Sequence, residues 1–213
     1  MVYPIQRIIV QPFLNGIWLK EINGRENIPS DGKFVATPNH QSFLDDWIVP
    51  RVIALHLNKK LHMYVNRNYY KNFISRHYLN HCECIPVEVG QALDKKEVND
   101  QAFKKALTYI ENGQPMCIYP EGHRSHDGKI QKGKFGAARL AIAAKVPILP
   151  IGIVGTREVL PKGKMIPKFK KIVTVNIGKP LNLEKFYGKE NDKESLAKAT
   201  ELIMKEISKL AGA

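Results

Sequence analysis

Short apolar runs alternate along the chain with segments of helical periodicity, and this alternation restricts the fold more than any other feature. The apolar runs cover residues 33–37, 61–65, 82–89, 115–120, 146–155 and 171–177. The helical patterns cover 99–112, 135–145 and 192–211. This order predicts an α/β fold with a mixed, largely parallel central sheet flanked by helices.

The most apolar run is VPILPIGIVG, residues 146–155. Its ten residues are about half of the ~20 that a membrane-spanning helix needs, so the run is interpreted as a core strand. The whole chain has 213 residues, which is long enough for one domain with a sizeable core and too short for two large ones.

The first twenty residues are apolar but interrupted by Gln6, Arg7, Gln11 and Asn15. They are therefore interpreted as a segment that lies in a membrane interface (1–20), followed by one domain over 21–213. The alternative, that this segment packs on the protein's own core, stays open.

The chain carries a net charge of +13, which attracts polyanions such as nucleic acid, anionic lipids or phosphorylated substrates. A nucleic-acid-binding domain is the alternative function of another class. It would interleave aromatic and basic side chains, and YYKNF (69–73) is a short hint of that pattern. The three cysteines, Cys82, Cys84 and Cys117, fit a reducing compartment. Cys82 and Cys84 are interpreted as small side chains on one face of a strand, and no metal site is expected.

The stretch NHQSFLDD (39–46) places His40 five residues before Asp45. Residues five apart in one regular helix point in different directions, so the pair meets only if the helix begins after His40. Ser42 and Asp45 have the spacing of a capping box, which predicts such a start with Ser42 as N-cap. His40 oriented by a carboxylate is a general-base arrangement. The alternative is that Asp45 only caps the helix. Asp46 is interpreted as a first-turn carboxylate that favours the helix dipole.

A second polar stretch, YPEGHRS (119–125), follows a predicted buried strand, where ligand sites of open α/β sheets lie. Gly122 permits a tight turn, Arg124 can bind a phosphate through two hydrogen bonds, and Glu121 can accept a hydroxyl or fix Arg124. Lys132 and Lys134 precede a predicted helix N-terminus, which also favours anions.

The two stretches together resemble the glycerolipid acyltransferases, the family of 1-acylglycerol-3-phosphate acyltransferases. NHQSFLD is similar to their NHxSxxD block and YPEGHRS to their FPEGTRS block. INGRENIP (22–29), QKGKFGAARLA (131–141) and VPILPIGI (146–153) are similar to further blocks in the same order. The resemblance covers residues 20–155 and implies a glycerolipid-acyltransferase-like fold.

The resemblance implies transfer of an acyl group from a thioester of coenzyme A or acyl carrier protein to the hydroxyl of lysophosphatidic acid, giving phosphatidic acid. Another lysophospholipid or glycerol 3-phosphate is the alternative acceptor. His40 would be the general base and Asp45 would orient it. Glu121, Gly122 and Arg124 would bind the acceptor.

The resemblance also implies the surroundings of the enzyme. Arg67 stands where the family often has a lysine and would add positive charge. No cofactor beyond the donor thioester is implied. An anionic membrane surface is the implied partner, with the protein peripheral on the cytoplasmic side of the cell membrane.

Two positions depart from the family pattern. Val89 stands where the family has an arginine that is tied to acceptor binding, which leaves the acceptor head group open. His123 replaces a threonine of the second block.

Overall fold

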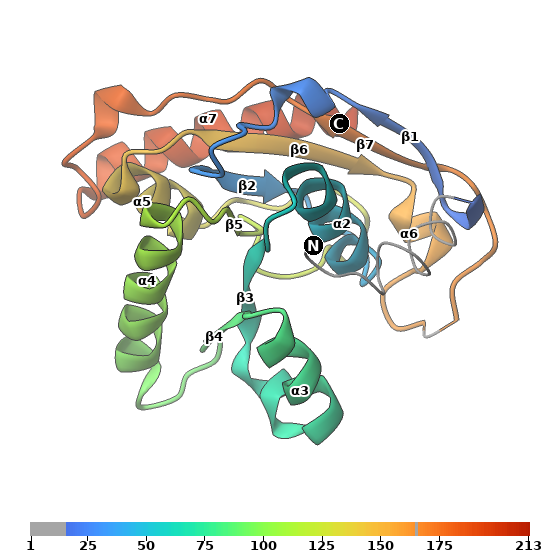
Figure 1. Ribbon diagram of the computed structural model, residues 1–213, viewed down its shortest axis with the longest axis horizontal. Coiled ribbons are helices and arrows are strands. Elements are labelled where there is room, and N and C mark those ends of the chain that lie inside the picture. Colours follow the sequence, from blue (N-terminus) through green and yellow to red (C-terminus); the bar gives the residue numbers. More distant parts are fainter. Residues whose placement is uncertain (1–15, 165) are drawn as a thin grey trace.

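The computed structural model describes residues 16–164 and 166–213. Within them one sheet has the strand order β1-β7-β6-β2-β5-β3-β4 (Figure 1). β7 runs antiparallel to β6, and the other neighbours are parallel. This confirms the predicted mixed, largely parallel sheet. The strands are β1 (Leu19–Asn23), β2 (Val35–Pro38), β3 (His62–Asn66), β4 (Ile85–Val87), β5 (Met116–Cys117), β6 (Ile148–Val154) and β7 (Val173–Ile177).

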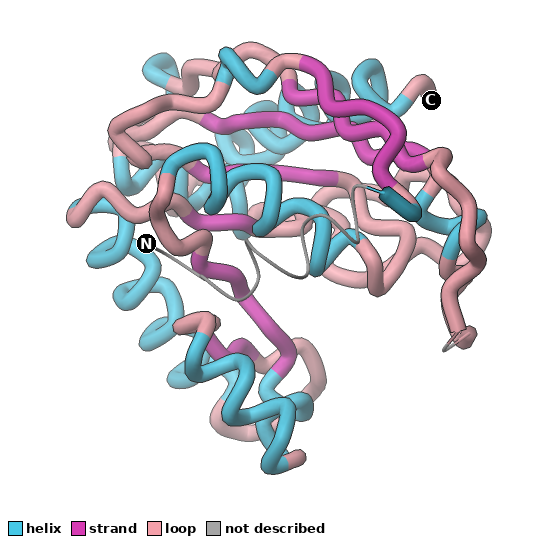
Figure 2. The backbone as a smooth tube through the Cα atoms, turned by 45° about the vertical axis from the view of Figure 1, so that its right-hand side comes forward, coloured by secondary structure: helices cyan, strands magenta, loops and turns pink. Residues whose placement is uncertain are grey.

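Helices cover both faces of this sheet (Figure 2). The α-helices of the described residues are α2 (Asp45–Leu57), α3 (Phe73–His81), α4 (Lys95–Glu111), α5 (Gly136–Ala144), α6 (Thr156–Val159) and α7 (Lys193–Ala211). Short 3-10 turns are η2 (Arg25–Asn27), η3 (Arg67–Lys71) and η4 (Glu184–Phe186). No helix among the described residues has both the length and the apolar composition to cross a membrane.

The central strands contribute alternate side chains to two hydrophobic cores. Val35 and Ile148 pack with α4, α5 and α7 on one face. Ala36 and Leu149, each one residue further along, pack with α2 on the other face. Successive strand side chains point to opposite faces, so burial on both faces explains why these runs are apolar throughout.

Some predicted boundaries were wrong for local reasons. The predicted strand 82–89 pairs only over Ile85–Val87. Cys82 is the C-cap of α3 and Cys84 precedes β4, so the prediction that both lie in a strand was wrong. Glu83 between them has a positive φ of 53°, which interrupts extended backbone. Among the described residues, Cys82, Cys84 and Cys117 form no disulfide bond.

The predicted interfacial segment lies mostly outside the described residues. Of its last residues, Trp18 is buried in the core. Leu19 and Lys20 belong to β1, whose strand pairs with β7. The sheet domain therefore includes residues from before the predicted boundary at 21.

Candidate active site

Two loops carry the candidate site, and each follows a central strand. β2 ends at Pro38 and leads into the loop of His40, while β5 ends at Cys117 and leads into the loop of Glu121. The two strands are parallel neighbours. Their carboxyl ends therefore meet at one edge of the sheet, where such folds bind ligands.

His40 and Asp45 meet as the spacing predicts. His40 Nδ1 lies 3.0 Å from Asp45 Oδ2, and the Asp45 side chain is buried. The same oxygen accepts the backbone N–H groups of Gln41 at 2.7 Å and Ser42 at 2.8 Å. A carboxylate that accepts the Nδ1 proton of a histidine fixes the tautomer whose lone pair is on Nε2. A histidine in this tautomer can accept a proton from a hydroxyl.

Ser42 is not the N-cap, so this prediction was wrong in detail. α2 begins at Asp45 with Leu44 as its N-cap. Asp45 does bind the Ser42 N–H, which is one half of a capping box. The Ser42 hydroxyl instead donates to the Leu160 carbonyl at 2.7 Å and accepts from the Leu44 N–H. The long-range bond to Leu160 fixes the turn that aims Asp45 at His40.

Two neighbours that sequence reasoning missed hold His40 in place. The Tyr119 ring stacks on the imidazole, with the centroids 3.9 Å apart. Asn39 is buried and bonds to both backbone groups of Ile153 in β6, at 2.6 and 3.0 Å. The only signal for Asn39 was its position beside His40, since its partner lies 114 residues away.

Glu121 joins the two loops. One carboxylate oxygen accepts the His40 backbone N–H at 2.7 Å, and the other accepts the Gln131 N–H at 2.8 Å. Burial raises the pKa of Glu121, and the two hydrogen bonds oppose that shift. Sequence reasoning assigned this carboxylate to a hydroxyl or to Arg124, but its bonds are to backbone N–H groups. Glu121 therefore positions His40.

Gly122 and Arg124 of the second loop line the same pocket as His40. Gly122 has a φ of 73°, a conformation that favours glycine, as the predicted tight turn requires. The Arg124 guanidinium lies 4.9 Å from the Phe43 ring centroid. Lys134 lines the pocket described below together with Gly122 and Arg124, whereas Lys132 is an exposed residue outside this set.

Arg67 does not join this basic group. Its guanidinium forms ion pairs with Glu88 and, at 2.6 Å, with Asp94. Two carboxylates thus already neutralise the charge that was predicted to serve the acceptor. Val89 is half exposed and lines the pocket, so this position presents an apolar surface where the family has an arginine.

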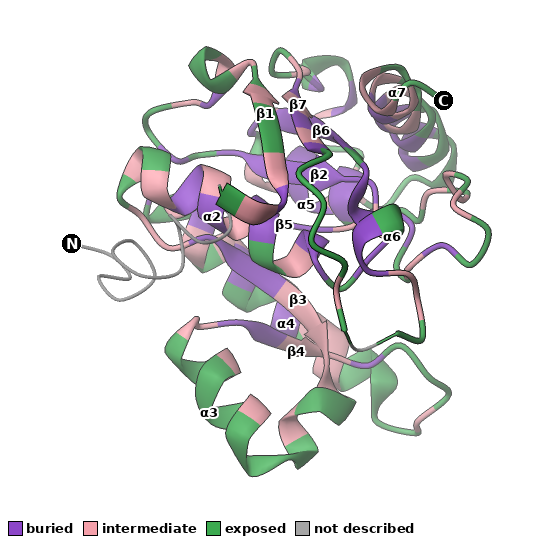
Figure 3. Cartoon of the chain, turned by 90° about the vertical axis from the view of Figure 1, so that its right-hand side faces the viewer, coloured by how far each residue is buried: buried purple, intermediate pink, exposed green. Residues whose placement is uncertain are grey.

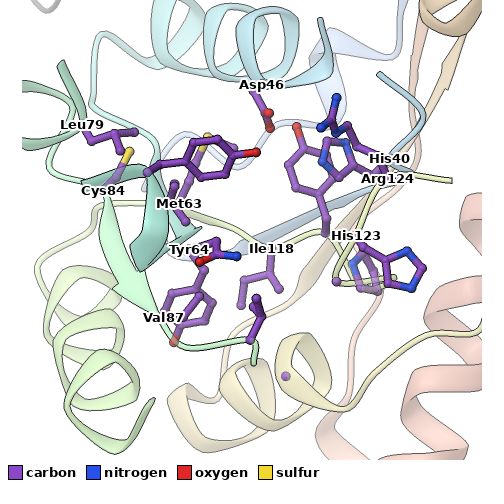
Figure 4. A pocket seen from close by; sticks show the side chains of 18 of the residues that line it. His40, Asp46, Met63, Tyr64, Leu79, Cys84, Val87, Ile118, His123 and Arg124 are labelled. Carbon is purple, nitrogen blue, oxygen red and sulfur yellow. The ribbon is translucent and has the colours of Figure 1, made fainter. Parts of the chain in front are cut away.

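A pocket of about 720 Å³ connects these groups (Figure 4). That volume falls in the roughly 300–1,000 Å³ range of small-molecule sites. One end is basic and holds Arg124 and His123 near His40, with Lys134 beside Gly122. The other end is apolar and is lined by Met63, Leu79, Cys84, Val87 and Ile118.

Asp46 lies where the two ends meet (Figure 4). It is in the first turn of α2, as the sequence predicts, but its carboxylate points into the pocket. Burial raises the pKa of Asp46 to about 6, and nearby Asp45 adds to the rise. His40 and Arg124 lower this pKa and so limit the shift. A carboxylate with a raised pKa in a pocket is a mark of functional sites.

The sheet, the pair of loops and the histidine–carboxylate contact define an α/β protein with a candidate site at the carboxyl ends of its central strands. The sequence profile of the Acyltransferase family matches residues 20–154. The chain therefore belongs to the Acyltransferase family, in agreement with the resemblance to glycerolipid acyltransferases.

Relatives with established names are similar over most of this chain. A chloroplastic 1-acyl-sn-glycerol-3-phosphate acyltransferase of Brassica napus is 28% identical over 157 residues, covering 73% of this chain and 42% of its own length. The Arabidopsis thaliana chloroplastic counterpart is 29% identical, covering 67% and 38%. The chain thus spans about two fifths of the length of these two relatives.

A solved structure has a similar fold. The crystal structure of the 1-acyl-sn-glycerophosphate (LPA) acyltransferase PlsC from Thermotoga maritima matches with a TM-score of 0.67 and 25% sequence identity. The match covers 92% of this chain and 73% of that chain.

Proposed function

We propose that the protein transfers a fatty acyl group from an acyl thioester to the free hydroxyl of lysophosphatidic acid, giving phosphatidic acid for phospholipid synthesis. The observation that carries this proposal is one pocket in which His40, held by the buried Asp45, lies beside basic side chains and which continues to an apolar end. A substrate whose hydroxyl lies close to its phosphate and which also carries an acyl chain matches this arrangement.

In this mechanism His40 Nε2 removes the proton from the acceptor hydroxyl while the oxygen attacks the thioester carbonyl. Asp45 stabilises the imidazolium that forms, because its oxygen already accepts the Nδ1 proton. The tetrahedral intermediate then collapses and the carbon–sulfur bond breaks. His40 returns its proton to the leaving thiolate. The products are the ester and the free thiol, without a covalent acyl-enzyme.

The basic end binds the acceptor phosphate. Arg124 and Lys134 supply positive charge there, and Gly136 and Ala137 at the N-terminus of α5 line the same pocket. Arginine and a helix N-terminus both favour a phosphate. The apolar end holds the acyl chain, because it buries methylene groups away from water.

The acyl donor and the location of the protein are part of the same proposal. Coenzyme A and acyl carrier protein are both donors with anionic carriers, and a chain with net charge +13 attracts either of them. The same charge supports a peripheral position on the anionic, cytoplasmic side of the cell membrane. No cofactor takes part in the proposed mechanism.

The test measures product formation with a set of acceptors. Purified protein is incubated with radiolabelled palmitoyl-coenzyme A and, in turn, lysophosphatidic acid, lysophosphatidylcholine and glycerol 3-phosphate. The proposal expects labelled phosphatidic acid to form fastest. Val89→Arg restores the arginine of the family at this position, and this variant is compared with the wild type on the same acceptors. A clear preference of the wild type for another acceptor would overturn lysophosphatidic acid as the substrate.

A further inference from the structure

Two surfaces beside the pocket expose apolar and basic side chains together. The first, which we call the α3 arm, comprises η3 and α3 (67–81). The second, the loop arm, is the segment 166–172 that precedes β7. Neither arm takes part in the chemistry described above.

The α3 arm has no buried residue within α3. Phe73 is 72% exposed and Ile74 is 77% exposed. The Arg76 guanidinium lies 5.8 Å from the Phe73 ring centroid. Residues 68–82 include Lys71 and Arg76 and contain no aspartate or glutamate. This helix therefore presents apolar side chains in a positively charged setting.

The loop arm exposes Ile166 (83%) and Phe169 (76%) on a backbone that is tied down. The Lys168 N–H donates to the Val159 carbonyl at 2.8 Å. The Lys168 carbonyl in turn accepts the Trp18 indole N–H, also at 2.8 Å. Phe169 is thus held outward beside an anchored residue. Residues 159–183 contain six lysines and no aspartate or glutamate.

Residues of the α3 arm line the pocket, and the loop arm follows a residue that lines it. Tyr69 and Tyr78 of the α3 arm line it. Lys162, four residues before the loop arm, lines it too and donates to the Arg124 carbonyl at 2.9 Å. Figures 1 and 3 share a vertical axis, and in both views the α3 arm, which follows β3, and the loop arm, which leads into β7, lie below β6. Most of their residues are exposed (green in Figure 3).

We propose that the α3 arm and the loop arm dock together on a bilayer that contains anionic phospholipids, with the pocket mouth between them facing the lipid. Exposed aromatic and aliphatic side chains enter the interface, and the lysines are attracted to the anionic head groups. A soluble acidic partner would engage the lysines without requiring Phe73 or Phe169. The inference rests on the proposed function, since a lipid acceptor then reaches the pocket from the bilayer.

The test is sedimentation of the full chain with sucrose-loaded vesicles of phosphatidylcholine, with or without phosphatidylglycerol. Two apolar variants remove one arm each: Phe73→Ser/Ile74→Ser and Ile166→Ser/Phe169→Ser. A charge variant replaces Lys168, Lys170 and Lys171 with Gln. The controls are Leu93→Ser, at a fully exposed site before α4, and Gln at three exposed lysines of α7, namely Lys193, Lys205 and Lys209.

Each apolar variant should weaken binding to the anionic vesicles by about tenfold or more, because two large apolar side chains no longer enter the interface. The charge variant should weaken binding by about 100-fold, because each of its three lysines contributes about fivefold near an anionic surface. The two controls should bind within about twofold of wild type. Unchanged binding of both apolar variants would overturn the proposal. Loss only in the charge variant would also overturn it and would indicate a soluble polyanion as the partner.

An activity measurement separates this inference from the proposed function. The docking variants should lose rate with lysophosphatidic acid embedded in vesicles but keep the wild-type rate with a short-chain acceptor dispersed in water. If the wild type shows no acyl transfer, the proposed function fails, while vesicle binding still decides the docking surface. Equal losses with both acceptors would contradict a docking role.

Discussion

Asp46→Asn should stabilise the protein at neutral and alkaline pH. Burial raises the pKa of Asp46 from 3.8 to about 6 in the folded chain. The folded state therefore binds this proton more tightly than the unfolded state does. The contribution of Asp46 to the free energy of unfolding is fully present below about pH 4 and is lost as pH rises through about 6.

The size of the effect follows from the shift. About two pKa units at 1.36 kcal/mol each give roughly 3 kcal/mol. Asparagine has nearly the same shape and cannot ionise, so the variant lacks the free-energy cost of ionising a buried carboxylate. Its gain over wild type should be small near pH 4 and approach about 3 kcal/mol at pH 8.

Urea denaturation at pH 4, 6 and 8 measures this difference. The control is Asp100→Asn, because Asp100 is an exposed partner of Lys96 and its pKa is lowered by that contact. The control should lose a little stability at pH 8, opposite in sign to Asp46→Asn. An Asp46→Asn variant that is no more stable than wild type at pH 8 would refute the reasoning.

Three further substitutions test other parts of the site. Arg124→Ala should raise the acceptor KM about tenfold or more while kcat changes little, because a charge-assisted bond to the phosphate is lost; steady-state kinetics showing a change only in the donor KM would contradict the assignment. Gly122→Ala should cost about 1–2 kcal/mol in urea denaturation, since its φ of 73° disfavours a Cβ atom, and an unchanged midpoint would count against this. Asn39→Ala should cost about 2–3 kcal/mol and lower kcat, because both Ile153 backbone groups lose buried partners; full stability and kcat together would remove its positioning role.

The sequence was sufficient for features that depend on local pattern. Apolar runs and helical periodicity predicted the strands and helices around the core. The spacing of His40 and Asp45 predicted their contact, because only a helix that begins after His40 allows it. Glu121 and Arg124 were found because they follow a buried strand.

Features that depend on distant partners could not be predicted in this way. Glu121 accepts the backbone N–H of His40, which lies 81 residues away. Every residue has the same backbone groups, so a sequence does not indicate which of them a side chain will contact. α3 has no buried residue, and this helix was not predicted from the sequence. The raised pKa of Asp46 results from the packing of the pocket around it. Arg67 carries a positive charge where the family often has a lysine, but it forms ion pairs with two nearby carboxylates.

The central claim is that His40 is the base for acyl transfer, and thiol release tests it most directly. Release of coenzyme A from palmitoyl-coenzyme A is followed with and without lysophosphatidic acid, for wild type and His40→Ala, with circular dichroism to confirm folding. The account expects acceptor-dependent release in wild type and a loss of at least about 100-fold in kcat in the variant. Near-normal release by folded His40→Ala would contradict it.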